Sequence, residues 1–229
     1  MVLDPENIKL HFDSTAKHYD TQRRQLIPCF DDFYGTALKL TDISNNPVRV
    51  LDLGAGTGLF SEMIAKKHPG ISLTLIDLSE EMLGIARQRL QYFTNISYIA
   101  GDYLNQPIEG IYDIVGSSLS IHHLSATEKE QLFAKIYALL NPGGIFINAD
   151  QVLGPDSQMD AFYKREWKET INKSGLSYDE LEQVNQRTSL DKMSTLDEQL
   201  GWLKRAGFLS VDVVYKSYSF TVMCGKKAQ

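Results

Sequence analysis

Apolar runs of strand length alternate with stretches of helical periodicity over residues 48–150 of the chain. Five such runs are predicted to be strands: 48–53, 72–76, 96–100, 111–117 and 144–149. Between the runs, apolar residues recur three or four positions apart, as in 126–140, which is typical of helices that pack on a sheet. This alternation predicts a parallel sheet with helices on both faces.

The two ends of the chain depart from the alternation. Residues 1–45 are predicted to form an N-terminal helical cap, and the polar helical segments of 155–195 a lid inserted after the fifth strand. A helix at 196–206 precedes two strand runs on either side of Lys216 and Ser217, which a two-residue turn would join as an antiparallel hairpin. The predicted fold class is α/β: one domain with a Rossmann-like, seven-stranded, mostly parallel sheet, a C-terminal hairpin, N-terminal helices and a helical lid.

Composition and charge narrow the classes of function. The 229 residues are 43% hydrophobic with a formal net charge of -6, which argues against binding to a nucleic-acid backbone. No apolar run reaches the ~18–20 residues of a membrane-spanning helix, and residues 1–12 lack the features of a signal peptide. Cys29 and Cys224 have no metal-binding spacing, so we expect free buried thiols and a cytoplasmic location.

A glycine-rich segment, LDLGAGTG, follows the first strand. Gly54, Gly56 and Gly58 allow positive φ and the close approach of a ligand to the backbone. The spacing is G-x-G-x-G rather than the dinucleotide pattern G-x-G-x-x-G, and no P-loop lysine follows. The loop therefore favours a ligand that has an adenosine but no phosphate.

Two carboxylates come at the ends of the next strands. Asp77 ends the second strand, where an acidic side chain can accept hydrogen bonds from ribose hydroxyls. Asp102 ends the third strand, where it can reach an adenine amine while Tyr103 covers the ring. Carboxyl ends of parallel strands meet at one edge of a sheet, so we expect both side chains beside the glycine loop.

The segments VLDLGAGTG, IDLSEEML, GDY, DIVGSSLSIHHL and LLNPGGIFINAD resemble, in this order, the motifs of class I S-adenosylmethionine-dependent methyltransferases. The resemblance implies S-adenosylmethionine as the cofactor and a small-molecule acceptor. It implies that Gly54 to Gly56 line the methionine part, that Ser118 faces the sulfonium, and that Tyr19 or Phe30 closes the site. The expected cofactor-binding residues are Tyr19, Phe30, Gly54, Ala55, Gly56, Gly58, Asp77, Leu78, Met82, Asp102, Tyr103 and Ser118.

Catalytic and acceptor-binding residues are predicted in two other segments. His122 and His123, in the loop after the fourth strand, are candidate general bases. Tyr163, Trp167 and Arg187, in the lid, are expected to shape the acceptor pocket. No HxxxH, CxxC or cluster of carboxylates indicates a metal site.

Two alternative functions stay open. Residues 177–208 also resemble carboxy-S-adenosylmethionine synthase, a relative linked to tRNA wobble-uridine modification, in which an arginine matched by Arg187 pairs with the extra cofactor carboxylate. Ser118 departs from that family, which has an asparagine there. The other alternative is a non-catalytic adenosyl-binding protein. The sequence also leaves a homodimer open.

Overall fold

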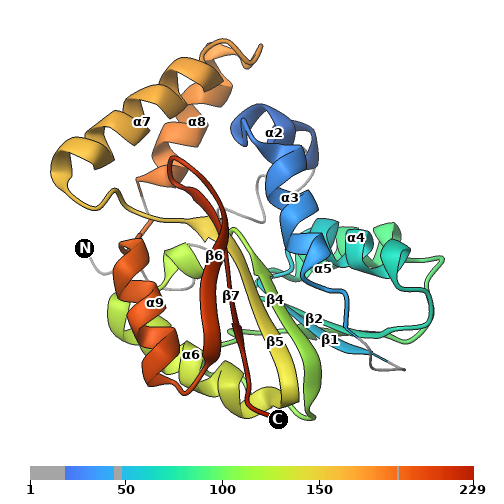
Figure 1. The fold of residues 1–229 in the computed structure, drawn as a ribbon. Helices are drawn as coiled ribbons and strands as arrows, with labels where there is room; N and C mark the ends of the chain where they lie inside the picture. Colours follow the sequence, from blue (N-terminus) through green and yellow to red (C-terminus); the bar gives the residue numbers. More distant parts are fainter. Residues whose placement is uncertain (1–18, 44–47, 190) are drawn as a thin grey trace.

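The computed structural model describes residues 19–43, 48–189 and 191–229 of the chain. A seven-stranded sheet with the order β3-β2-β1-β4-β5-β7-β6 forms its centre (Figure 1). The first five strands pair in parallel, and β7 runs antiparallel between β5 and β6, which confirms the predicted fold class. The strands are β1 (Arg49–Leu53), β2 (Ser72–Asp77), β3 (Ile96–Ala100), β4 (Tyr112–Ser118), β5 (Leu140–Gln151), β6 (Leu209–Ser217) and β7 (Phe220–Lys226).

Helices cover both faces of the sheet (Figure 1). Successive side chains of a strand point to opposite faces, so Val50 packs in one core beneath α3, α4 and α5 while Leu51 packs in another beneath α6 and α9. The helices are α2 (Tyr19–Leu26), α3 (Phe30–Lys39), α4 (Leu59–Lys67), α5 (Glu80–Arg89), α6 (Ala126–Leu139), α7 (Ser157–Ile171), α8 (Tyr178–Thr188) and α9 (Leu196–Arg205), with a 3-10 turn η1 (Ile121–His123).

Helix starts follow local sequence chemistry. Ser79, predicted as a cap, accepts a hydrogen bond from the Met82 backbone N–H at the start of α5. Capping boxes begin α6, α8 and α9, and in each a serine or threonine and a glutamate three residues later bond to each other's backbone N–H groups. These caps fix the residue at which each of these helices begins.

The lid consists of α7 and α8, which lie beyond the upper end of the sheet beside α2 (Figure 1). A small apolar cluster of Leu26, Ile171 and Val184 joins the three helices. Trp167 adds a polar tie, because its Nε1–H donates to the Leu26 carbonyl at 2.9 Å. No helix in the described part of the chain is long and apolar enough to cross a membrane.

Three details differ from the predictions. The fifth strand begins at Leu140 rather than 144, because residues 141–144 bulge between the pairs Tyr112–Leu140 and Ile114–Ile145. The hairpin turn is at 218–219 rather than 216–217: Ser217 pairs with Phe220, which buries the Phe220 ring. Cys29 is half-buried, although both cysteines are free as predicted. Residues 1–18 of the predicted helical cap, which include the segment 1–12 expected to lack a signal peptide, lie outside the described residues.

Candidate active site

The glycine loop connects the end of β1 to α4. Gly54, Gly56 and Gly58 have φ values of +65°, +53° and +75°, which lie in the left-handed region that favours glycine. A Cβ on Gly54 would come within 1.9 Å of Ser120 Oγ, so only glycine fits against the loop that follows β4. Nothing described lies within 4 Å of a Cβ placed on Gly56, which leaves that part of the loop open.

Asp77 faces this loop from the end of β2. Its Oδ2 accepts a hydrogen bond from the Gly56 N–H at 2.7 Å, and its Oδ1 accepts one from the Ser79 N–H at 2.9 Å. The structure therefore brings the predicted ribose-binding carboxylate and the glycine loop together. Leu78, the next residue, is half-buried, whereas the Met82 side chain is fully buried beneath α5.

The loop after β3 carries the predicted adenine site. Asp102 caps its own loop, since its carboxylate accepts bonds from the Leu104 N–H and the Asn105 amide. The Tyr103 hydroxyl lies 3.2 Å from Ser120 Oγ, and a ring carbon is 3.4 Å from the place of a Cβ on Gly54. Burial raises the pKa of Tyr103, so this hydroxyl stays protonated. Tyr103 thus packs beside the glycine loop.

Two polar residues beside the glycine loop were not predicted from the sequence. Asp52, in the middle of β1, is 1% exposed and accepts a 2.6 Å hydrogen bond from Ser61 at Oδ2, while its Oδ1 has no described partner. Tyr34 hydrogen-bonds the Ser118 hydroxyl at 2.9 Å. Asp52, Tyr34 and Ser118 line a small cavity with Gly54 and Ala55. The sequence feature that could have identified Asp52 is a carboxylate within the apolar run VRVLDLG.

The two aromatic residues predicted to close the site have different positions. Phe30 is buried in the core, where its ring lies 4.8 Å from that of Tyr34. Tyr34, one turn later on α3, is the residue that contacts Ser118. Tyr19 is the first residue of α2, and its side chain lies outside the described part of the structure.

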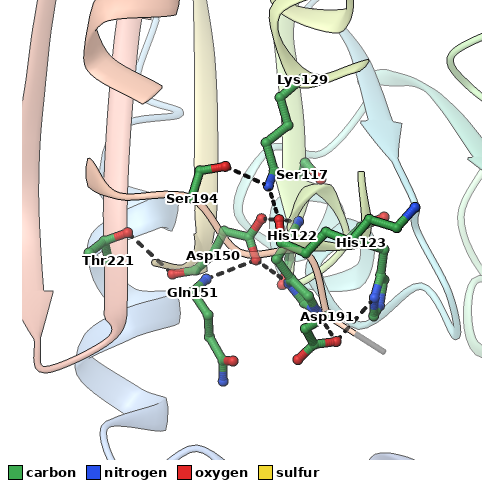
Figure 2. Close-up of polar contacts among 12 residues, drawn as sticks. Ser117, His122, His123, Lys129, Asp150, Gln151, Asp191, Ser194 and Thr221 are labelled. Carbon is green, nitrogen blue, oxygen red and sulfur yellow. Dashed lines mark hydrogen bonds and ion pairs between the residues drawn. The ribbon is translucent and has the colours of Figure 1, made fainter. Parts of the chain in front are cut away.

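The predicted bases lie in a chain of alternating carboxylates and imidazoles (Figure 2). His122 Nδ1 is 2.5 Å from Asp150 Oδ1, at the end of β5, and His122 Nε2 is 3.6 Å from Asp191 Oδ1. His123 Nδ1 is 3.2 Å from the same Asp191 oxygen. These contacts, in the order Asp150, His122, Asp191, His123, connect the carboxyl end of β5 to the segment that returns from the lid.

The two histidines differ in charge preference. Burial opposes a charge on His122, but Asp150 and Asp191 outweigh it, so the pKa of His122 is raised. Burial and then the neighbouring His122 lower the pKa of His123. His122 therefore favours the cationic form, whereas His123 favours the neutral form that can accept a proton.

A narrow cleft opens beside this chain of residues. Trp167 and Arg187, two of the residues expected at the acceptor pocket, line it from the lid, and Arg23 lines it from α2. Tyr163 is not among its lining residues: its hydroxyl accepts a 3.0 Å hydrogen bond from Lys216 on β6. The full lining is Arg23, Leu26, Ile27, Leu119, His122, His123, Gln151, Trp167, Arg187, Thr188 and Asp191.

The same cluster has spacing that could suit a metal ion. One atom each of His122, His123 and Asp191 lie within 4.8 Å of one another. The charges favour an ion-pair network instead, because His122 bridges two carboxylates and Arg187 also acts on Asp191. Arginines on two sides of the cleft make it more suitable for an anion than for a cation.

Residues 50–144 match the family model described as a methyltransferase domain. The chain thus contains a methyltransferase domain, and it is similar along its length to S-adenosylmethionine-dependent methyltransferases. It is an enzyme, and its cofactor is S-adenosylmethionine. The similarity favours an enzyme over the non-catalytic adenosyl-binding alternative.

Similar proteins include two curated relatives of this methyltransferase. A carboxy-S-adenosyl-L-methionine synthase of Nautilia profundicola is 25% identical over 97% of both chains. A malonyl-[acyl-carrier protein] O-methyltransferase of Halalkalibacterium halodurans is 24% identical over 90% of this chain and 83% of its own. The two relatives have different reactions in their names, so they leave the acceptor open.

Solved structures show the same fold at lower identity. A putative O-methyltransferase of Nostoc punctiforme has a TM-score of 0.68 at 19% identity, covering 94% of this chain and 60% of that one. Haemonchus contortus phosphoethanolamine N-methyltransferase 2, solved with S-adenosyl-L-methionine, has a TM-score of 0.65 at 19% identity, covering 86% and 53%. This methyltransferase thus spans somewhat over half the length of these solved chains.

The residues around the glycine loop fit this cofactor. Gly54 leaves no room for a side chain, and Asp52 Oδ1 is a buried acceptor that lines the adjoining cavity. A carboxylate oxygen in that position suits the ammonium of the methionine moiety. Asp77, at the end of the neighbouring strand, suits the ribose hydroxyls.

Proposed function

We propose that this enzyme transfers a methyl group to an oxygen or nitrogen of a small, negatively charged acceptor that binds in the cleft beneath the lid. One observation carries the proposal: the cleft combines the His123–Asp191 pair with Arg23 and Arg187. Arginine side chains favour carboxylate or phosphate groups, and a neutral imidazole can accept the proton of a nucleophile.

Bound S-adenosylmethionine supplies an activated methyl group. Gly54, Asp52, Asp77 and the loop of Tyr103 are proposed to hold the cofactor, with Ser118 on the acceptor side. The lid helices exclude water and orient the acceptor, and positioning of this kind contributes roughly 7–11 kcal/mol. This catalytic work needs no covalent bond to the protein.

His123 is the proposed general base. Asp191 Oδ1 lies 3.2 Å from its Nδ1, which favours a proton on Nδ1 and leaves Nε2 to take the proton of the acceptor. His122, held as a cation by Asp150 and Asp191, keeps Asp191 in place and favours the neutral form of His123. His122 and His123 thus have separate roles, one in positioning and one in proton transfer.

A methyl-transfer screen over small hydroxy- and amino-acids tests the function, with S-adenosylhomocysteine formation as the readout. His123→Gln should lower kcat by about 10²–10⁴-fold on the acceptor that reacts. His68→Gln is the matched control, because His68 hydrogen-bonds Thr41 and is not among the residues lining the cleft. Equal activity of the His123→Gln variant and the wild type would remove His123 from the mechanism.

The second candidate function is synthesis of carboxy-S-adenosylmethionine. The N. profundicola relative with that name aligns over 97% of the chain, and Arg187 lies in the cleft where it could pair with a carboxylate. Mass spectrometry of the cofactor that co-purifies with the protein distinguishes the two. The carboxylated form would favour the synthase, and S-adenosylmethionine or S-adenosylhomocysteine would favour methyl transfer.

A further inference from the structure

Lys135 on α6 bonds to the backbone of the loop that carries Asp102 and Tyr103. Its Nζ donates to the carbonyls of Tyr103, Leu104 and Gln106 at 2.8, 3.0 and 2.7 Å. Three carbonyls therefore converge on one ammonium group. A loop of irregular backbone is held in a single shape by such a contact, because moving any one carbonyl leaves a donor unsatisfied.

Lys129, on the same helix, makes the corresponding contact with the segment that returns from the lid. Its Nζ donates to the Lys192 carbonyl and to Ser194 Oγ, the latter at 3.0 Å (Figure 2). These two acceptors follow Asp191 by one and three residues. The Lys192 N–H also donates to the His122 carbonyl at 2.9 Å, so the segment is fixed against the histidine turn as well.

The burial of Lys129 indicates that this contact has a specific role. The residue is 0% exposed, and an ammonium group is costly to bury unless it is hydrogen-bonded. Its described hydrogen-bond partners are one carbonyl and one hydroxyl, both in the segment after Asp191. An apolar residue on α6 would fill the space at less cost but could not hold that segment.

We propose that α6 positions the two halves of the active site separately, Lys135 the cofactor loop and Lys129 the carboxylate that orients the base. Lys129 and Lys135 are positioning residues, since each acts through the backbone that it binds. The proposal rests on the proposed function for the role of Asp191. It predicts that a substitution of either lysine alters only the half of the active site that this lysine contacts.

The experiment compares Lys129→Met and Lys135→Met, which keep most of the apolar stem and lose the donor. Each variant receives two measurements: the Kd for S-adenosylhomocysteine by calorimetry, and the pH titration of the histidine rings by NMR. Lys135→Met should raise the Kd about tenfold and leave the titrations of His122 and His123 unchanged. Lys129→Met should leave the Kd within twofold and lower both histidine midpoints.

The direction of the histidine shift separates positioning from simple loss of charge. The Lys129 ammonium lowers the pKa of His122, whereas Asp191 raises the pKa of both His122 and His123. Removing the charge alone would raise the His122 midpoint. Movement of Asp191 away from the histidines would instead lower the His122 midpoint. Lys129→Arg keeps both the charge and the donors, so its His122 midpoint should equal that of the wild type.

Several results would overturn the proposal. They are a rise or no change in the His122 midpoint of Lys129→Met, an unchanged Kd in Lys135→Met, or the same change of Kd and midpoints in both variants. If Lys129→Met does not fold, Lys129→Gln replaces it. Failure of both to fold would assign Lys129 to folding instead. Neither readout uses an acceptor, so an enzyme inactive on every acceptor would contradict the proposed function alone.

Discussion

Asp52 gives the sharpest test of the cofactor side, because its carboxylate destabilises the free protein. It is 1% exposed on β1, and burial raises its pKa from 3.8 to about 7 despite the hydrogen bond from Ser61. Between these two values the unfolded chain loses the proton while the folded protein keeps it. The free energy of unfolding should therefore fall as pH rises from about 4 to 7, and the stabilising contribution is complete only below 3.8.

The magnitude follows from the size of the shift. Each pH unit in this window costs about 1.4 kcal/mol, so the wild type should lose roughly 3 kcal/mol through Asp52 between pH 5 and pH 8. Asp52→Asn keeps an acceptor for Ser61 Oγ–H and has no charge to bury. The amide adds a donor that costs about 1–3 kcal/mol at every pH if it finds no partner, but this offset does not depend on pH.

The assay is urea unfolding of wild type and Asp52→Asn at pH 5, 6, 7 and 8. The stability difference, variant minus wild type, should rise by roughly 3 kcal/mol in favour of the variant across the series. Asp113→Asn is the control, because both Asp113 oxygens accept hydrogen bonds, from the Arg49 N–H and the Asn141 amide. That variant should be less stable than wild type. A flat difference curve for Asp52→Asn would refute the reasoning.

Three further predictions concern ligand contacts and the loop. Gly54→Ala should lower stability by more than ~2 kcal/mol in urea unfolding and abolish calorimetric binding of S-adenosylhomocysteine, because the Cβ would clash with Ser120 at positive φ. Gly56→Ala, with open space around the Cβ, should cost only about 1 kcal/mol of strain, and equal losses would contradict the role given to the clash. Asp77→Ala should weaken S-adenosylmethionine binding by about 1.5–3 kcal/mol, and an unchanged calorimetric affinity would remove Asp77 from the site. Arg187→Ala should change that affinity by under ~1 kcal/mol, whereas loss of selective binding of the carboxylated cofactor would favour the synthase.

Much of the fold could be predicted because it depends on local patterns. Strand runs and helical periodicity placed β1 to β4 within a residue of their observed ends, and Ser79 marked the start of α5. The exceptions depend on partners elsewhere. The start of β5 at Leu140 depends on pairing with Tyr112, and the hairpin turn depends on the register that buries Phe220.

The proximity of the glycine loop and Asp77 was also readable from the sequence, because parallel strands bring their carboxyl ends to one edge. Gly54, Gly56 and Asp77 needed only their place after β1 and β2. Asp52 and Tyr34 were missed, since a strand carboxylate and a helical tyrosine have no distinctive spacing. Their contacts with the cavity exist only when α3 packs on the sheet.

The acceptor half was decided by tertiary structure. The sequence by itself determined that His122 and His123 follow β4, and hence that they lie at the carboxyl ends of the parallel strands. It could not pair them with Asp191, 68 residues later in the segment returning from the lid, because nothing in the polar sequence of the insertion indicates which of its carboxylates reaches the histidines. Only the folded chain places this carboxylate at the histidines, in a segment whose Lys192 carbonyl and Ser194 hydroxyl accept hydrogen bonds from Lys129 on α6.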